Sequence, residues 1–381
     1  MPKTLSYLHL LSLVLLVSGC AATTAGTPSS APAQTNTSLN KPVAASTRTA
    51  PGRIPSDSAS SARESSYLAR PDVQRFASQT AQQKNIPLAT VQDLLSQANR
   101  LPVAIRLMTP PEPGQPVQPK NWATYRAKFV EPIRIKAGKA FMQEHQTVLL
   151  QAQQRFGVPA NIIAAIIGVE TLYGQHMGNY RVLDAITTLS FDYPDPNRPD
   201  RVSMFQGQLA DLIELHHQGK IDATRQLGSY AGALGIPQFM PTSLKAYAVS
   251  ANPSAKRIEL DTNVNDAIFS VGNFLKVHGW VTGLPVFAPV DLPADAADLV
   301  EGGLTPTLDW QTLKQSGAKL APNAKTGEWS QYPLGVINLP LPNRDTVQYR
   351  TATPNFFALT QYNRSYFYAT AVTDLAQALE D

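Results

Sequence analysis

One stretch, Val158–Gly174, constrains the fold more than any other part of this 381-residue chain. It reads VPANIIAAIIGVETLYG, and from Ile162 to Val169 it is apolar on nearly every side of a helix. A helix without a polar face is normally buried, so the pattern predicts a helix at the centre of a core. Pro159 suits the first helical position, and Gly174 suits the left-handed position after the last turn.

The predicted central helix carries one carboxylate, Glu170, at its carboxyl-terminal end. Burial among apolar neighbours and the negative end of the helix dipole both raise the pKa of a carboxyl group. A general acid that keeps its proton near neutral pH is prepared in this way. Taken alone, the stretch is equally compatible with a surface glutamate near a helix end.

Composition sets broad bounds on the rest of the chain. With 43% hydrophobic and 16% charged residues, the chain can form one large or two ordinary domains. The net charge is +4, and the lysines and arginines are scattered rather than clustered. We therefore expect no nucleic-acid partner.

The amino terminus has the features of an export signal. Lys3 precedes an apolar run, Leu8–Val17, that is too short to span a bilayer. The run leads into Leu-Val-Ser-Gly-Cys, which ends at Cys20, the only cysteine, and resembles the lipobox of bacterial lipoproteins. The resemblance implies that residues 1–19 are a signal peptide and that Cys20 is lipidated. Ala21 after the cysteine favours the outer membrane, with the protein facing the periplasm.

Residues 20–68 are rich in Ala, Ser, Thr and Pro and nearly lack large apolar side chains. Such a segment buries too little surface to offset its ordering entropy, so we predict a disordered tether. A buried structural role for Cys20 fits this composition poorly. The folded, catalytic region is predicted to cover residues 69–381.

Most of the folded region has helical spacing of apolar residues, which predicts a mainly α fold (α+β class). From residue 283 to about 354, proline and glycine are frequent and only short strands are expected. The stretch Asn355–Asn363 is interpreted as a short strand or turn. Helices are predicted for residues 72–84, 88–98, 138–156, 204–217, 265–277 and 365–379.

No common cofactor or metal motif is present in the sequence. The six histidines and one cysteine have no metal-ligand spacing, and neither a P-loop nor a nucleophile elbow occurs. What remains is Glu170, with Tyr173 three residues further on the same helical face, and a glycine-rich run, Ser229–Met240. Glycines let a sugar approach the backbone closely. Tyrosines such as Tyr125, Tyr230 and Tyr362 could stack on sugars, although each could equally be a core residue.

Several separated blocks, in order, resemble the membrane-bound lytic murein transglycosylase B family, from about Asn121 to the carboxyl terminus. The blocks are Gly168–Gly174, Leu183–Ala185, Leu189–Pro194, Ser229–Gly235, Gln238–Pro241 and Tyr362–Ser365.

The resemblance implies a lysozyme-like catalytic core with an additional helical region and a small β-containing region. It implies cleavage of the β-1,4 bond between N-acetylmuramic acid and N-acetylglucosamine in peptidoglycan glycan strands, forming 1,6-anhydromuramoyl ends without a cofactor. Glu170 is implied as the single acid and then base, with Ser229 and Asn363 as polar groups around the reacting sugar. The implied cleft-lining residues are Tyr125, Tyr173, Tyr230, Gln238, Met240 and Tyr362.

Glu170 has no convincing carboxylate partner in the sequence. Ordinary glycosidases place two carboxyl groups about 5–9.5 Å apart, and Asp184, Asp192 and Asp195 are candidates only because they are near in sequence. A single acid suffices if the acetamido oxygen of the substrate stabilises the cationic centre. Two alternatives stay open, a hydrolytic muramidase and a non-catalytic murein-binding lipoprotein.

One segment departs from the family pattern. Some members carry a calcium loop after the glycine-rich block, and here that region is Ser250–Asp266. Calcium loops need alternating oxygen ligands and a central glycine. This segment has Lys256 and Arg257 in its middle and no glycine, so we expect it to bind no calcium.

Overall fold

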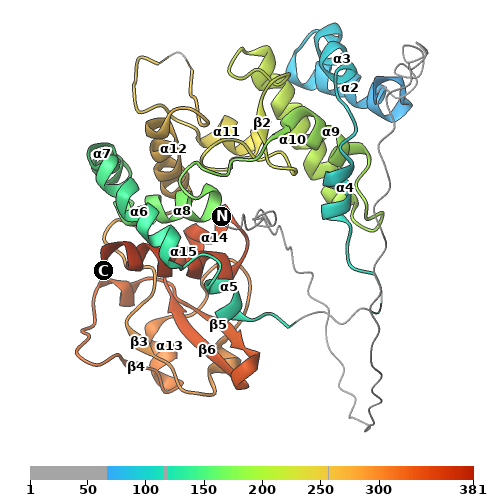
Figure 1. Cartoon of the computed structure of the whole chain (residues 1–381). Coiled ribbons are helices and arrows are strands. Elements are labelled where there is room, and N and C mark those ends of the chain that lie inside the picture. Colours follow the sequence, from blue (N-terminus) through green and yellow to red (C-terminus); the bar gives the residue numbers. More distant parts are fainter. Residues whose placement is uncertain (1–66, 113, 115–118, 256) are drawn as a thin grey trace, which may run out of the picture. The chain divides into compact units, whose positions relative to one another are not determined.

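The computed structural model of the chain describes residues 67–112, 114, 119–255 and 257–381 (Figure 1). The predicted signal peptide, Cys20 and all but the end of the predicted tether lie outside these residues. The first described element, η1 (Tyr67–Ala69), begins inside the segment predicted as tether. Its Tyr67 is buried, with the hydroxyl donating to Asp192 Oδ2 at 2.8 Å.

Short helices follow η1, and the first two agree with the prediction. The first of them ends where Asn85 adopts a left-handed conformation at φ 53°. Pro87, with its fixed φ, directly precedes the second. The four helices are α2 (Pro71–Lys84), α3 (Leu88–Ser96), α4 (Pro102–Met108) and α5 (Trp122–Arg126).

The prediction of one continuous helix over residues 138–156 is wrong, because the helix is interrupted at His145. The segment is divided into α6 (Pro132–Glu144) and α7 (Gln146–Phe156). The break is His145, at φ −105° and ψ 22°, and its ring lies 4.6 Å from that of Phe141. Neither proline nor glycine marks the break, so spacing alone gave no signal for it.

The central helix is α8 (Ala160–Thr171), and every residue from Ile162 to Thr171 is buried. This confirms the predicted buried helix, which begins one residue later than expected because Pro159 is its N-cap. Ile163, Ile166 and Ile167 are 0% exposed, and burial of each contributes about 1.5–3 kcal/mol relative to exposure. The helix contacts α6, α7, α12 (Val264–Val277) and α15 (Tyr366–Glu380) (Figure 1).

A second group of helices surrounds the glycine-rich run. In this group α9 (Val182–Phe191) packs on α10 (Pro199–His217), which in turn contacts α11 (Pro241–Tyr247). The two-residue strands β1 (Tyr180–Arg181) and β2 (Leu227–Gly228) pair antiparallel and bring the start of α9 to the start of the run.

The strands β3 to β6 all lie inside the segment predicted to contain β structure. The main pair is an antiparallel hairpin in which Gly335 is opposite Ala352 and Leu341 is opposite Thr346. A separate hydrophobic cluster around Trp310, Trp329 and Leu313 supports this segment. Its elements are β3 (Val290–Asp291), η2 (Ala296–Leu299), α13 (Trp310–Gln315), β4 (Lys319–Leu320), η3 (Glu328–Gln331), β5 (Gly335–Leu341), η4 (Pro342–Arg344) and β6 (Thr346–Ala352).

The strand or turn predicted for residues 355–363 is wrong, because these residues form most of α14 (Pro354–Tyr362). Thr353 caps this helix, its hydroxyl oxygen accepting from Asn355 N, and Pro354 occupies the first turn. The closing helix was predicted correctly, and Ser365 is its N-cap. Among the described residues, no helix combines the length and apolar character that crossing a bilayer requires.

Candidate active site

Glu170 lies one residue before the end of α8 and is 8% exposed. Tyr368 of α15, 2% exposed, donates its hydroxyl proton to Glu170 Oε1 at 2.6 Å. Burial raises the pKa of Glu170 to about 7, against the opposing effect of this hydrogen bond. A carboxyl group with its pKa raised in this way can hold a proton near neutral pH and also release it, as a group that both donates and accepts a proton requires.

Three phenols surround this carboxyl group. Burial raises the pKa of Tyr125, Tyr362 and Tyr368, and the charge of Glu170 raises each pKa further. Such an effect requires proximity, so Tyr125 and Tyr362 lie within electrostatic range of Glu170. The rings of Tyr362 and Tyr368 are stacked with centroids 6.2 Å apart.

The chain turns sharply after Glu170. Leu172, Tyr173 and Gly174 have φ values of 49°, 59° and 87°, so three residues in succession are left-handed. Each non-glycine residue in this conformation costs about 1–2 kcal/mol. The turn is held by Thr171 Oγ1, which accepts from Gly174 N at 2.9 Å and donates to Ile236 O at 2.9 Å. The backbone that follows Glu170 is thus strained, and the two hydrogen bonds of Thr171 hold it in place.

The expectation that Tyr173 shares a helical face with Glu170 is wrong, because α8 ends at Thr171. The Tyr173 ring instead packs against Phe141, with centroids 5.1 Å apart. A Cβ atom at Gly138 or Gly168 would overlap the ring, so these two glycines provide its space. The Tyr173 hydroxyl is buried without a hydrogen-bond partner among the described residues. Its position therefore points to packing beneath the turn.

The glycine-rich run forms a wall beside Glu170. Ile236 O accepts from Thr171, the neighbour of Glu170, and Pro237 O accepts from the Tyr362 hydroxyl at 2.6 Å. Ser229, 2% exposed, folds the start of the run on itself, since its Oγ accepts from Ala233 N at 3.0 Å. The run is thereby attached both to α8 and to α14.

Gln238 is the polar residue of this wall with an unused acceptor. It is 7% exposed and adopts a left-handed conformation at φ 51°. Its Nε2 donates to Met177 O at 3.1 Å and to Gly235 O at 2.9 Å. Its Oε1 is buried and has no hydrogen-bond partner among the described residues. A buried acceptor without a partner is costly, and a ligand N–H would satisfy it.

The other residues implied as cleft-lining have different surroundings. Tyr230 is buried in a cluster with Leu189 and Phe205 of α9 and α10, and Met240 packs against the same cluster and the main core. Asn363 follows Tyr362 directly, is partly exposed, and its backbone oxygen accepts from Ser365 N at 2.6 Å.

The acidic residues considered as partners for Glu170 have structural roles. Asp184 is paired with Arg181, at 2.5 Å. Asp192 is paired with Arg70 at 2.6 Å and Arg100 at 3.0 Å. Asp195 accepts from Asn197 N at 3.0 Å. The sequence reasoning missed Tyr368, the residue that contacts Glu170 directly. The sequence placed Tyr368 in the predicted closing helix, but it lies 198 residues from Glu170, and no local pattern indicated a contact between them.

The site therefore consists of a buried glutamate with a raised pKa, Glu170, in a helical core. A sequence profile of the family described as "Transglycosylase SLT domain" matches residues 69–377. The chain therefore belongs to this transglycosylase family, and its fold is the lysozyme-like fold of the lytic transglycosylases.

Individual relatives agree with this assignment. The membrane-bound lytic murein transglycosylase B of Escherichia coli K12 is 36% identical over 318 residues, which cover 82% of this chain and 84% of the relative. The structure of the Escherichia coli lytic transglycosylase Slt35 in complex with calcium matches with a TM-score of 0.68 and 34% identity, covering 81% of this chain and 93% of that one. Pseudomonas aeruginosa SltB3, in complex with NAG-anhNAM-pentapeptide, matches with a TM-score of 0.66 and 25% identity, covering 81% and 79%.

The loop Ser250–Asp266 does not fit a calcium ion. Asp266, 1% exposed, accepts hydrogen bonds from Ser250 Oγ at 2.8 Å, Ala251 N at 2.9 Å and Glu259 N at 3.2 Å. Ser250 and Asn252 also accept from backbone N–H groups of the loop. The side-chain oxygens of Ser250, Asn252 and Asp266 are thus already bonded to donors of the loop itself.

Proposed function

We propose that this member of the family cleaves the β-1,4 bond between N-acetylmuramic acid and N-acetylglucosamine and forms 1,6-anhydromuramoyl ends, with Glu170 as its only acid and base. The observation that carries the proposal is the buried Glu170 carboxyl, with its pKa near 7 and its phenol partner. The nearby aspartates in sequence are engaged in ion pairs and turns.

In the first step Glu170 gives its proton to the glycosidic oxygen as the bond to C1 of the muramoyl residue breaks. The acetamido oxygen of the same sugar stabilises the positive charge at C1. In the second step the Glu170 carboxylate takes the proton of the 6-hydroxyl group, and O6 bonds to C1. Glu170 ends protonated, as it began, and no water is consumed.

The surroundings of Glu170 suit this sequence of steps. Tyr368 holds Oε1, which leaves Oε2 to carry the transferred proton. The apolar burial that raises the pKa also excludes water, which strengthens electrostatic interactions in the site. A water molecule at C1 would give hydrolysis instead, so a dry site favours the internal 6-hydroxyl group.

The substrate is held by residues around this centre. Ser229 and Asn363 are proposed to contact the reacting sugars, and Gln238 Oε1 is suited to accept from an acetamido N–H because it lacks a partner in the described structure. Tyr125 and Tyr362 would border the sugar next to Glu170. For Tyr173, Tyr230 and Met240 the packing described above supports an indirect role, in which they shape the walls.

We also propose that the chain is anchored to the outer membrane by lipid on Cys20 and faces the periplasm. The support is the lipobox-like sequence that ends at Cys20, together with a relative named as membrane-bound. Cys20→Ala should leave an uncleaved or unlipidated protein that no longer sediments with outer membranes. Unchanged fractionation would contradict the anchor.

Mass spectrometry of purified peptidoglycan digested by the protein tests the reaction. The proposal predicts anhydromuropeptides from the wild type and none from Glu170→Gln. Products heavier by one water would indicate a muramidase, and absence of release would indicate a murein-binding protein. Anhydro products from Glu170→Gln would show that another residue is the acid.

A further inference from the structure

Thr171, the residue after Glu170, joins the end of α8 to the glycine-rich run. Its side chain is buried, and its Oγ1 donates to Ile236 O at 2.9 Å while accepting from Gly174 N at 2.9 Å. Both partners are backbone groups, one in the run and one in the turn that follows Glu170. The hydroxyl group therefore holds two separate stretches of main chain in a fixed relation to the end of α8.

The part of the run that Thr171 holds also carries a group proposed to bind the sugar. Gln238 is two residues beyond Ile236, and its buried Oε1 is the acceptor proposed for an acetamido N–H. The backbone N–H and Nε2 of Gln238 donate to Gly235 O at 3.2 Å and 2.9 Å, which closes residues 235–238 into one hydrogen-bonded turn. A displacement of Ile236 would therefore move Gln238 with it.

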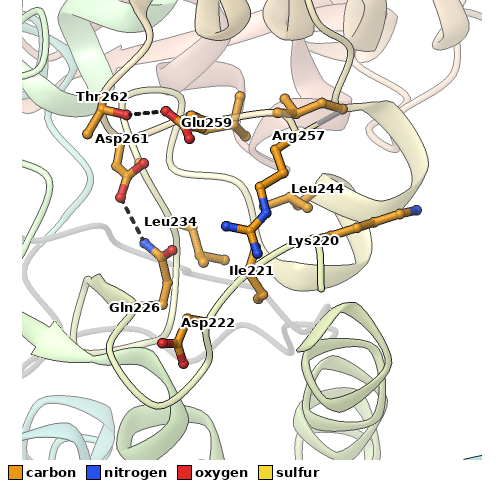
Figure 2. Close-up of a pocket in the computed structure, with 13 residues that line it drawn as sticks. Lys220, Ile221, Asp222, Gln226, Leu234, Leu244, Arg257, Glu259, Asp261 and Thr262 are labelled. Atoms are coloured by element: carbon orange, nitrogen blue, oxygen red, sulfur yellow. Dashed lines mark hydrogen bonds between the residues drawn. The ribbon is translucent and has the colours of Figure 1, made fainter. Parts of the chain in front are cut away.

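The backbone of Ile236 is also bonded to the segment that precedes α12. Ile236 N donates to Leu260 O at 2.7 Å. Leu260 lines a pocket of about 290 Å³ together with Leu234 and Gly235 of the run (Figure 2). A pocket supplies no atoms for van der Waals contact, so packing supports the run less on this side than inside the core. Where the run lies then depends on the hydrogen bonds that Ile236 makes in its two directions.

We propose that Thr171 is a positioning residue, whose hydroxyl group sets the distance between the Glu170 carboxyl group and the sugar held by the glycine-rich run. The inference rests on the proposed function, because it takes Glu170 as the acid and the run as a sugar-binding wall. Thr171 is 1% exposed, and it acts through the backbone of the run rather than by touching the substrate.

Loss of this hydroxyl group would leave the acid and the sugar-binding groups present and change only their relative position. Proton transfer depends strongly on that position, since a misplacement of about 1 Å lowers the rate by up to about 100-fold. Binding of the sugar depends on it much less, because the run keeps its own polar groups. The expected signature is therefore a fall in kcat without a matching change in KM.

The test is Thr171→Val, which keeps the branched shape of the side chain and removes the hydroxyl group. The substrate is soluble, uncross-linked glycan strands, and rates are expressed per folded molecule, with the folded fraction taken from near-ultraviolet circular dichroism. In this variant kcat should fall about 10- to 100-fold, with KM changed by less than about twofold. Thr171→Ser keeps the hydroxyl group and should retain most of kcat.

Thr187→Val, on α9, is the matched control. Thr187 is 0% exposed, and its hydroxyl group has no hydrogen-bond partner within the described part of the chain, so kcat and KM should both stay unchanged. If Thr171→Val does not fold, Thr171→Ala carries the same expectation, because the smaller side chain leaves room for water at the two freed backbone groups.

Three results would overturn the proposal: an unchanged kcat per folded molecule in Thr171→Val, an equal loss in Thr171→Ser, or a rise in KM alone. Products are counted whether they are anhydro or hydrated. Hydrated products from the wild type, together with the expected fall in Thr171→Val, would contradict the proposed 6-hydroxyl step and support the role of Thr171.

Discussion

Two buried carboxyl groups, Glu170 at the end of α8 and Asp266 in the first turn of α12, have opposite surroundings. Glu170 receives one hydrogen bond, from Tyr368, and lies at the negative end of its helix dipole. Asp266 accepts from Ser250 Oγ and from the N–H groups of Ala251 and Glu259, and lies at the positive end of its helix.

Burial alone therefore does not determine what a carboxyl group does. Both side chains are less than 10% exposed, yet Asp266 accepts three hydrogen bonds and Glu170 accepts one. Asp266 therefore ties a loop to a helix, whereas the sparsely bonded Glu170 is suited to exchange a proton. The two groups lie at opposite helix ends, and a negative charge is favoured at the amino-terminal end and disfavoured at the carboxyl-terminal end.

The largest effect should come from Glu170→Gln. The amide keeps the size of the side chain but cannot donate and then accept the proton, so kcat should fall about 10³-fold. The measurement is the initial rate of release of soluble muropeptides from peptidoglycan. Asp266→Asn should keep most of its activity per folded molecule, and a comparable fall in that variant would contradict the purely structural role given to Asp266.

Asp266→Ala should show the largest loss of stability. The Ser250 hydroxyl and two backbone N–H groups would lose their acceptor, which costs about 2–3 kcal/mol in the free energy of unfolding. Chemical denaturation measures this loss. Added calcium should not restore stability in either the wild type or the variant, because Ser250, Asn252 and Asp266 already accept hydrogen bonds within the loop. Stabilisation of the wild type by calcium would contradict the role given to Asp266.

Glu170 should reduce stability as the pH rises. Its folded pKa of about 7 exceeds its ordinary value of 4.5, so between these values the folded state binds more protons than the unfolded state. Stability then falls with rising pH, and Glu170→Gln removes that fall. The advantage of Glu170→Gln over the wild type should grow by about 2 kcal/mol from pH 5 to pH 8. A constant difference would show that the pKa is not raised.

Tyr368→Phe should have the smallest effect, about a tenfold fall in kcat. The lost hydrogen bond lowers the pKa of Glu170 in the wild type, so its removal should raise that pKa. The decline of kcat above neutral pH should therefore begin at higher pH in the variant. A fall in kcat without a shift of the pH profile would show that Tyr368 supports the site by packing and does not affect the pKa of Glu170.

Part of this account could be predicted from the sequence. The apolar run that ends in Glu170 predicted the buried core helix, because an uninterrupted apolar face has few alternatives to burial, and the role proposed for Glu170 came from the resemblance. The blocks around Ser229 and Tyr362 supplied the wall residues by resemblance. Composition also indicated where the strands β3 to β6 occur.

Other features depend on tertiary contacts that local patterns do not contain. Tyr368 reaches Glu170 only because α15 packs on α8. Tyr173 was predicted to share a helical face with Glu170. The helix α8 instead ends at Thr171, two residues before Tyr173, in a left-handed turn fixed by Thr171 and Ile236. The helix α14 was missed although Thr353 and Pro354 form a capping signal, because its apolar residues lack clear helical spacing.

The titration of the Glu170 side chain tests the central claim most directly. Carbon-13 NMR of glutamate carboxyl groups, with Glu170→Gln used to assign the resonance, follows its protonation against pH. The environment of Glu170 predicts a midpoint near pH 7, and loss of cleavage as the pH rises through that midpoint, since the protonated form starts the reaction. A midpoint near 4.5, the ordinary value for glutamate, would contradict the account.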